Sequence, residues 1–216
     1  TIDSADDSIH ANDSVTINGG EISAATGDDG IHADNGLTIN DGTIIVNKSY
    51  EGLEASVITI AGGDIQVLAS DDGVNAGGGS DTTDSGQFGQ DSFGGGPGGG
   101  DQADDSKEVV ITGGTLSIDA EGDGLDSNGN VTMSGGIVIV NGPTQGGNGA
   151  LDYNGTFEIT GGTLVAAGTT DMAMNVSGGT QRSVAITFDQ SQAADTLITL
   201  QDTEGNTLLS YAHSKD

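Results

Sequence analysis

The feature that most constrains this chain is a repeated unit, which is clearest at residues 27–47 (GDDGIHADNGLTINDGTIIVN). The unit holds three short runs, each introduced by a glycine, in which apolar and polar residues alternate. Alternation over four or five residues is typical of a strand with one buried face, and such a run is too short for an amphipathic helix. Three strands and three turns in about 22 residues predict one triangular coil of a solenoid.

A turn ending in glycine, between the second and third strands, marks each repeat along the chain. Its second glycine falls at Gly20, Gly42, Gly63, Gly114, Gly136, Gly162 and Gly179. The long step from Gly63 to Gly114 is interpreted as one coil plus an insertion. Glycine is expected at such corners because the turns need positive φ or a close approach of two backbones.

Three apolar columns run through the repeats. The first precedes each marker glycine, at Val15/Ile17, Leu37/Ile39, Ile58/Ile60, Val109/Ile111, Val131/Met133, Phe157/Ile159 and Met174/Val176. The second follows it, at Ile22/Ala24, Ile44/Val46, Ile65/Val67, Leu116/Ile118, Ile137/Ile139 and Leu164/Ala166. The third is Ile9, Ile31, Leu53, Val74, Leu125 and Leu151. Stacked coils with these side chains inward predict an all-β fold, a right-handed parallel β-helix of about six to seven coils.

We expect the β-helix to span residues 1–179 and a C-terminal segment to span 180–216. The repeat stops at 77–107, where a composition rich in Gly, Asp and Ser predicts a flexible insertion. A mobile spacer is favoured there over a binding element built on Phe88 and Phe93.

The C-terminal segment is predicted to cap the β-helix with a β-hairpin. Alternation predicts strands at 183–188, 196–200 and 207–211, with a turn at 202–206. A cap is expected because the open end of a solenoid is an unpaired sheet edge.

The charge of the chain limits its partners. Among 216 residues, Asp and Glu number 33 against 4 Lys and Arg, a formal net charge of −29. This disfavours nucleic acid and anionic membrane surfaces, and makes a cation the natural complement. The chain has no cysteine, which excludes disulfides and thiolate metal sites, and no apolar run long enough to span a membrane. Because no signal peptide is seen and Thr1-Ile2 already has the pattern of the end of a strand, we expect a processed or trimmed chain.

Carboxylates also recur once per coil. The residue before the first strand's leading glycine is Asp29, Glu51, Asp72 and Asp123, with Asp7 in the first coil and Asn148 in the sixth. Two residues after that glycine come His32, Glu54, Asn75 and Asp126, with His10 in the first coil and Asp152 one place late in the sixth. Further carboxylates in the turns are Asp6, Asp28 and Asp71.

Stacked carboxylates favour a bound cation. Two such charges one coil apart repel by roughly 3–4 kcal/mol at an effective dielectric near 20, unless they splay into water or share an ion. Oxygen ligands without thiols suit Ca²⁺, which we prefer to a solvated acidic edge. A transition metal on His10 and His32 is a lesser hypothesis, because surface histidines hydrogen-bonded to the neighbouring acids explain them more simply. His213 is assigned no function.

The motifs DDGIHADNGLTINDG, EGLEASVITIAGG, DDGVNAGGGSD, FGGGPGGG and GDGLDSNGNVTMSGG resemble the bacterial carbohydrate-binding β-helix domain family of clostridial cell-surface proteins, over residues 1–211. That family is similar in fold to pectate lyases. The resemblance implies a secreted or cell-surface β-helix that carries Ca²⁺ and binds plant cell-wall polysaccharide, either acidic glycan or cellulose, without established catalysis. By motif, it implies calcium ligands at Asp28, Asp29, Glu51, Glu54, Asp71, Asp72, Asn75, Asp123 and Asp126. The sixth coil departs from the motif at Asn148.

Three hypotheses for function remain open. The first is a non-catalytic carbohydrate-binding module, and the second is a calcium-stabilised structural or adhesive β-helix that assembles with other chains or within a larger protein. The third is a pectate-lyase-like enzyme. It is disfavoured because the basic residues of this chain lie too far apart to act together in one site, at Lys48, Lys107, Arg182 and Lys215. With no tryptophan and few aromatic residues, weak calcium-bridged binding to acidic glycans is expected instead of tight cellulose binding.

Overall fold

The computed structural model describes residues 1–77 and 102–215, and these residues form an all-β protein without helices. No helix that could cross a membrane is therefore found among them. The predicted insertion at 77–107, with Phe88 and Phe93, lies mostly outside the described residues. The strands of the main sheet are β1 (Ile2–Asp3), β2 (Ile9–Ala11), β3 (Ser14–Ala25), β4 (Ile31–Ser49), β5 (Leu53–Ile60), β6 (Asp64–Ala69), β7 (Val74–Ala76), β8 (Glu108–Ile111), β9 (Thr115–Ala120), β10 (Leu125–Ser127), β11 (Asn130–Met133), β12 (Ile137–Asn141), β13 (Phe157–Ile159), β14 (Thr163–Ala167) and β15 (Gly178–Gly179).

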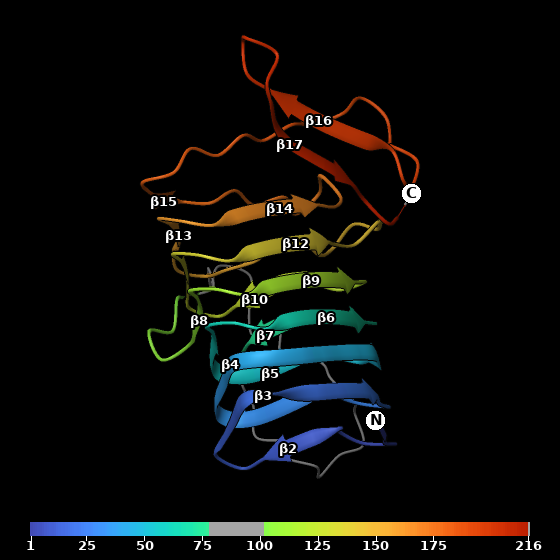
Figure 1. The fold of residues 1–216 in the computed structure, drawn as a ribbon, viewed down its shortest axis with the longest axis vertical. Coiled ribbons are helices and arrows are strands. Elements are labelled where there is room, and N and C mark those ends of the chain that lie inside the picture. The colour runs from blue at the N-terminus through green and yellow to red at the C-terminus, as the bar shows by residue number, and fades with distance from the viewer. Residues whose placement is uncertain (78–101, 216) are drawn as a thin grey trace.

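These strands wind into a parallel β-solenoid of about 7 turns. Figure 1 shows the coils stacked one above another, from the N-terminal coil at the bottom to β14 near the top. Each strand pairs in parallel with the equivalent strand of the next coil, so that β4, for example, pairs with β3, β5 and β6. The predicted parallel β-helix is therefore confirmed.

The apolar columns form the core because coil-to-coil pairing keeps them in register. In the first column, Val15 pairs with Leu37, Leu37 with Ile58, and Ile58 with Val109. The residues of the third column also pair from coil to coil, from Ile9 through Leu125 to Leu151. Most of these side chains are fully buried.

One predicted pair in the second column is wrong. Ile137 and Ile139 were assigned to the core, but Val138 and Val140 pair with Leu116 and Ile118 and are buried. Ile137 is 45% exposed. The corner at Gly136 determines which alternate residues of the strand point inward. A shift of one residue turns every side chain to the opposite face.

The glycines at the corners are needed for two reasons. All seven marker glycines have positive φ, from 78° at Gly114 to 120° at Gly42. At Gly114, a Cβ atom would also lie 2.7 Å from the carbonyl carbon of Gly62 in the preceding coil. Both observations match the predicted roles of glycine, because an L side chain would meet backbone strain and a steric clash at once.

The last predicted repeat does not complete a coil. The predicted core residue Met174 is 37% exposed, because β15 pairs Gly179 with Ile159 and the register has shifted, whereas Val176 is partly buried and packs against the core as predicted. The strand predicted at 183–188 is also absent, and its residues Val184 and Ile186 are exposed. The step from Gly162 to Gly179 is several residues shorter than a full coil, which leaves too little chain to follow the perimeter in register.

A two-stranded antiparallel hairpin, β16 (Leu197–Gln201) and β17 (Thr207–Ala212), follows as predicted. It lies beyond β14 at the C-terminal end of the solenoid (Figure 1). The chain after it is tied to the side of the solenoid, where the Lys215 ammonium lies 3.0 Å from Asp119 and 3.1 Å from Glu121.

Candidate cation-binding site

Two polar columns lie side by side where each coil enters its first strand. The acidic column consists of Asp7, Asp29, Glu51, Asp72 and Asp123. The mixed column consists of His10, His32, Glu54, Asn75 and Asp126, which pair in register from β2 through β4, β5 and β7 to β10. The acidic column is held in the same stack, because Gly30 donates to the Glu51 carbonyl and Gly52 to the Asp72 carbonyl, each at 2.9 Å. The predicted vertical alignment of these residues is therefore found.

The acidic column is also a hydrogen-bonded ladder, which the sequence analysis missed. The Asp7 Oδ1 atom accepts from the Asp29 amide at 3.0 Å, and Asp29 Oδ1 accepts from the Glu51 amide at 3.2 Å. Higher up, Asp72 accepts from the Asp123 amide, and Asp123 accepts from the Gly149 amide. Each of these bonds ties one carboxyl oxygen to the backbone of the next coil, so the ladder fixes the positions of the stacked acids. The sequence signal was an acidic residue before glycine once per coil.

The sixth coil corrects the predicted alignment by one residue. Gly149, not Asn148, continues the acidic column, because its amide binds Asp123 and its carbonyl accepts from Gly124. Leu151 pairs with Leu125, so Asp152 follows Asp126 in register instead of falling one place late. The carboxylate of the acidic column is thus missing in this coil, whereas that of the mixed column is kept.

Several of these polar side chains are buried to a degree that the sequence did not indicate. The exposed fractions are 5% for Asp29, 7% for Glu51, 4% for Asp72, 2% for Asn75 and 0% for His32. The prediction that His32 is a surface residue is therefore wrong, whereas His10 has a side chain that is 36% exposed. Because buried charges require compensation, the most strongly constrained part of the site lies in coils two to four.

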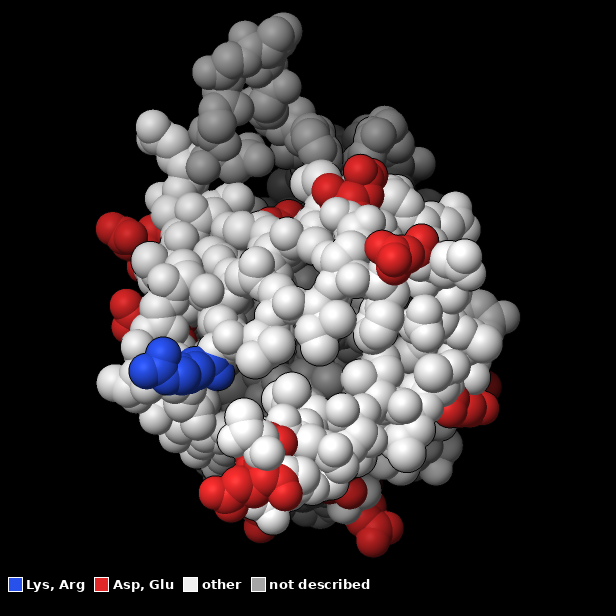
Figure 2. All heavy atoms as spheres, turned by 90° about the horizontal axis from the view of Figure 1, so that it is seen from above, with Lys and Arg blue, Asp and Glu red and all other residues white. Residues whose placement is uncertain are grey.

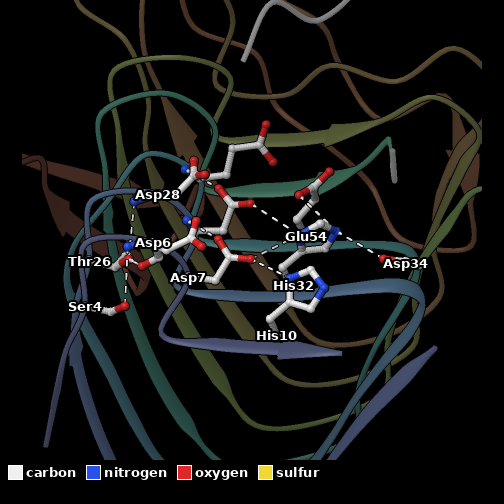
Figure 3. Close-up of polar contacts among 11 residues, drawn as sticks. Ser4, Asp6, Asp7, His10, Thr26, Asp28, His32, Asp34 and Glu54 are labelled. Atoms are coloured by element: carbon white, nitrogen blue, oxygen red, sulfur yellow. Dashed lines mark hydrogen bonds and ion pairs between the residues drawn. The ribbon is translucent and has the colours of Figure 1, made fainter. Parts of the chain in front are cut away.

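His32 lies at the centre of the most crowded part of the site. Its Nδ1 atom lies 3.4 Å from Asp7 Oδ2 and 3.7 Å from Asp29 Oδ2. Its Nε2 atom lies 3.6 Å from Glu54 Oε2 and 3.8 Å from Asp34 Oδ1. Figure 3 shows Asp7 and Asp34 on opposite sides of this ring, with His10 and Glu54 before and after it in the stack.

Burial and neighbouring charge shift the protonation of these groups. Burial, together with the nearby Glu54 carboxyl, raises the pKa of Asp29 to about 9. Burial, with the charges of Asp126, Asp123 and Asp71, raises the pKa of Asp72 to about 9.

The same surroundings act on His32 and Asp7 in opposite directions. The Asp7 carboxylate beside Nδ1 raises the pKa of His32 to about 9, against its burial. Burial opposes ionisation of Asp7 as well, but its hydrogen bonds with His32 and His10 lower its pKa overall. Without a metal cation, the raised pKa values therefore favour the protonated forms of Asp29, Asp72 and His32 at neutral pH.

Only some of the predicted calcium ligands lie in tight groups. Among the described His, Asp and Glu residues, three groups bring ligand atoms within 4.8 Å of one another: Asp7 with His10 and His32, Asp29 with His32 and Glu54, and Asp6 with Asp7 and Asp28. All three groups lie in the first three coils. The remaining predicted acidic ligands, which stand outside these groups, are Glu51, Asp71, Asp72, Asp123 and Asp126.

Glu51 and Asn75 form a second buried contact between the columns. The Asn75 amide donates to Glu51 Oε1 at 3.1 Å. Its carbonyl oxygen, Asn75 Oδ1, is buried and accepts no hydrogen bond from the described residues. Buried oxygens normally find a donor or a cation, so this atom marks the middle of the site as a place that suits a cation.

The chain finds no match among protein-family models, curated proteins or solved structures.

The raised pKa values predict that the metal-free protein becomes less stable as the pH rises. Asp29 and Asp72 bind protons more tightly when folded, so their stabilising effect is complete below about pH 4 and is lost as the pH approaches 9. His32 acts in the same direction between about pH 6.5 and 9. Thermal melts in metal-free buffer should show a melting temperature lower by about 5 °C or more at pH 9 than at pH 5.

Repulsion among exposed carboxylates also lowers the stability of the protein as the pH rises. A matched pair of variants separates this effect from that of the buried acids. Asp72→Asn, which cannot ionise, should flatten the pH dependence, whereas Asp64→Asn, at an exposed position of β6, should leave it unchanged. Equal slopes for both variants would show that the buried column does not carry the effect.

Proposed function

We propose that this protein is a non-catalytic, calcium-binding module that binds acidic or plant cell-wall polysaccharides outside the cell. The observation that carries the proposal is the burial of Asp29, Glu51 and Asp72 in one in-register column. The ladder engages only one oxygen of Asp29 and of Asp72. Carboxylate oxygens joined by an amide oxygen at Asn75 are a ligand set that suits Ca²⁺.

Calcium would also solve an electrostatic problem of glycan recognition. A chain with a formal net charge of −29 repels an anionic polysaccharide at long range. Ca²⁺ binds six to eight oxygens, so an ion held by a few protein ligands keeps positions for the carboxylates of uronic acids. The resemblance to the clostridial family supports polysaccharide as the ligand class.

A lyase function is less well supported by the distribution of cations. Lys107 donates to the Ser56 hydroxyl at 2.8 Å, and Lys215 pairs with Asp119 and Glu121, at the end of β9. These two cations therefore lie on different parts of the solenoid, whereas proton abstraction beside a bound uronate requires a basic group at the calcium site.

One observation favours the second candidate, a calcium-stabilised structural β-helix that assembles with other chains. The C-terminal segment exposes large apolar side chains, with exposed fractions of 64% at Val184, 56% at Ile186 and 67% at Leu197. Figure 2 shows that the end face is formed largely by residues that are neither acidic nor basic, with carboxylates mainly toward its edges. Such a face suits packing against another protein surface.

We expect Ca²⁺ to stabilise the fold through the acidic column. The carboxylates converge only in the folded coils, so Ca²⁺ binds the native state preferentially and adds about 2.7 kcal/mol per site at a hundredfold excess over Kd. The melting temperature at pH 7.5 should therefore rise by about 5–10 °C per site in millimolar Ca²⁺ relative to EGTA at equal ionic strength.

Glu51→Gln should remove much of this calcium shift, because it keeps the shape and the acceptor for Asn75 but lowers the charge. Glu21→Gln, at an exposed position of β3, is the matched control and should retain the full shift. Identical melting temperatures with and without Ca²⁺ would mean that the acidic column is stabilised by its ladder and protons alone.

Retention on a polysaccharide panel tests the glycan proposal itself. We expect the protein to bind polygalacturonate in Ca²⁺, to be released by EGTA, and to bind cellulose more weakly, because the fold presents no aromatic platform built on tryptophan. Failure to bind any glycan, alongside an intact calcium shift in thermal melts, would support the structural candidate instead.

A further inference from the structure

The first two coils bring two histidine rings against one carboxylate. His10 and His32 pair in register, and their ring centroids lie 4.8 Å apart with the planes at 67°. Both Nδ1 atoms approach the same atom, Asp7 Oδ2, at 2.7 Å from His10 and 3.4 Å from His32. Two imidazole nitrogens and a carboxylate oxygen facing one point differ in kind from the oxygen-only ligands higher in the column.

The ladder fixes the orientation of the carboxylates at this point. Asp7 Oδ1 accepts from the Asp29 amide, which leaves Oδ2 directed at the rings. Asp29 Oδ1 accepts from the Glu51 amide, which leaves its Oδ2 at 3.7 Å from His32 Nδ1. The backbone of the next coil thus holds one oxygen of each acid, and the other is presented to the same side as the imidazoles.

The spacing suits a tetrahedral metal ion. Zinc lies about 2.0–2.1 Å from nitrogen and oxygen ligands, so two ligands of one tetrahedral ion stand about 3.3 Å apart. His32 Nδ1 stands 3.4 Å from Asp7 Oδ2 and 3.7 Å from Asp29 Oδ2, close to that separation. The shorter His10 contact is a hydrogen bond, which the half-exposed His10 ring can open when an ion replaces the proton.

The far side of the His32 ring has the outer partners that metal-binding histidines usually have. Its Nε2 atom faces Glu54 Oε2 at 3.6 Å and Asp34 Oδ1 at 3.8 Å. A carboxylate beside one ring nitrogen favours the proton there and leaves the lone pair of the other nitrogen for the metal. This arrangement directs Nδ1 toward Asp7 and Asp29.

We propose that Asp7, His10 and His32, whose ligand atoms all lie within 4.8 Å of one another, form a site for Zn²⁺ or a similar divalent transition-metal ion. The site differs in chemistry from the proposed calcium sites, because imidazole nitrogens suit Zn²⁺ and are poor ligands for Ca²⁺. It goes beyond the glycan-binding proposal and does not require it. By joining β2 to the start of β4, the ion would fasten the first coil onto the second.

The site is tested with metal alone and the full chain. Zn²⁺ titrated by calorimetry at pH 7.5 in the presence of millimolar Ca²⁺ should bind at one ion per chain. Co²⁺ used as a probe should give the intense visible absorption of a tetrahedral ion, and Zn²⁺ should displace it. His10→Ala, at a half-exposed position that should not disturb folding, is expected to weaken Zn²⁺ binding at least a hundredfold.

Two controls separate this site from other metal binding. His213→Ala removes the third histidine of the chain, in the C-terminal segment, and should bind Zn²⁺ like the parent protein. Glu51→Gln should keep Zn²⁺ binding even where it reduces the calcium shift, so failure of one proposal is distinguishable from failure of the other. Unchanged Zn²⁺ affinity in His10→Ala, or displacement of Zn²⁺ by millimolar Ca²⁺, would overturn the assignment and leave a proton-bridged network at His32.

Discussion

The coil-to-coil hydrogen bonding of the parallel β-solenoid is the constraint on which the rest of the structure depends. Each strand pairs with its equivalent about 4.8 Å above and below, so whatever a coil presents at one position, the next coil presents beside it. For the core this repetition is favourable, since Ile58 lies on Leu37 and Val109 lies on Ile58. For the corner before the first strand, the same rule places carboxylate on carboxylate.

The acidic column resolves this conflict with two devices. The ladder gives one oxygen of Asp7, Asp29, Asp72 and Asp123 a backbone donor from the following coil. Protons, and in our proposals metal ions, then compensate the charge that remains. The histidines of the neighbouring mixed column divide the site chemically, because His10 and His32 offer nitrogen ligands at its N-terminal end, whereas Glu54, Asn75 and Asp126 offer oxygen ligands above them. One repeated turn can in this way present sites for two classes of cation.

The sequence predicted the architecture well because its determinants are local and repeated. Alternating apolar residues and glycines with positive φ specify the strands and corners of every coil. Prediction failed at Ile137, where a shift of one residue along the strand decides which side chains face the core. It also failed at Met174, where the last repeat is too short to complete a coil. The alignment of polar columns was visible in the sequence, but the burial of His32 and the hydrogen bonds from backbone amides of the next coil to Asp7, Asp29, Asp72 and Asp123 were not. Those features depend on side-chain orientation between coils, which spacing alone does not determine.

The most direct test of this account is amide hydrogen exchange along the acidic column. If the carboxylates are ladder acceptors, the amides of Asp29, Glu51, Asp123 and Gly149 should be protected nearly as well as those of the core strands, although they lie in turns. Their protection should rise further when metal is bound. Exchange at the rate of exposed turn amides, with or without metal, would contradict the ladder and with it the basis of both proposed sites.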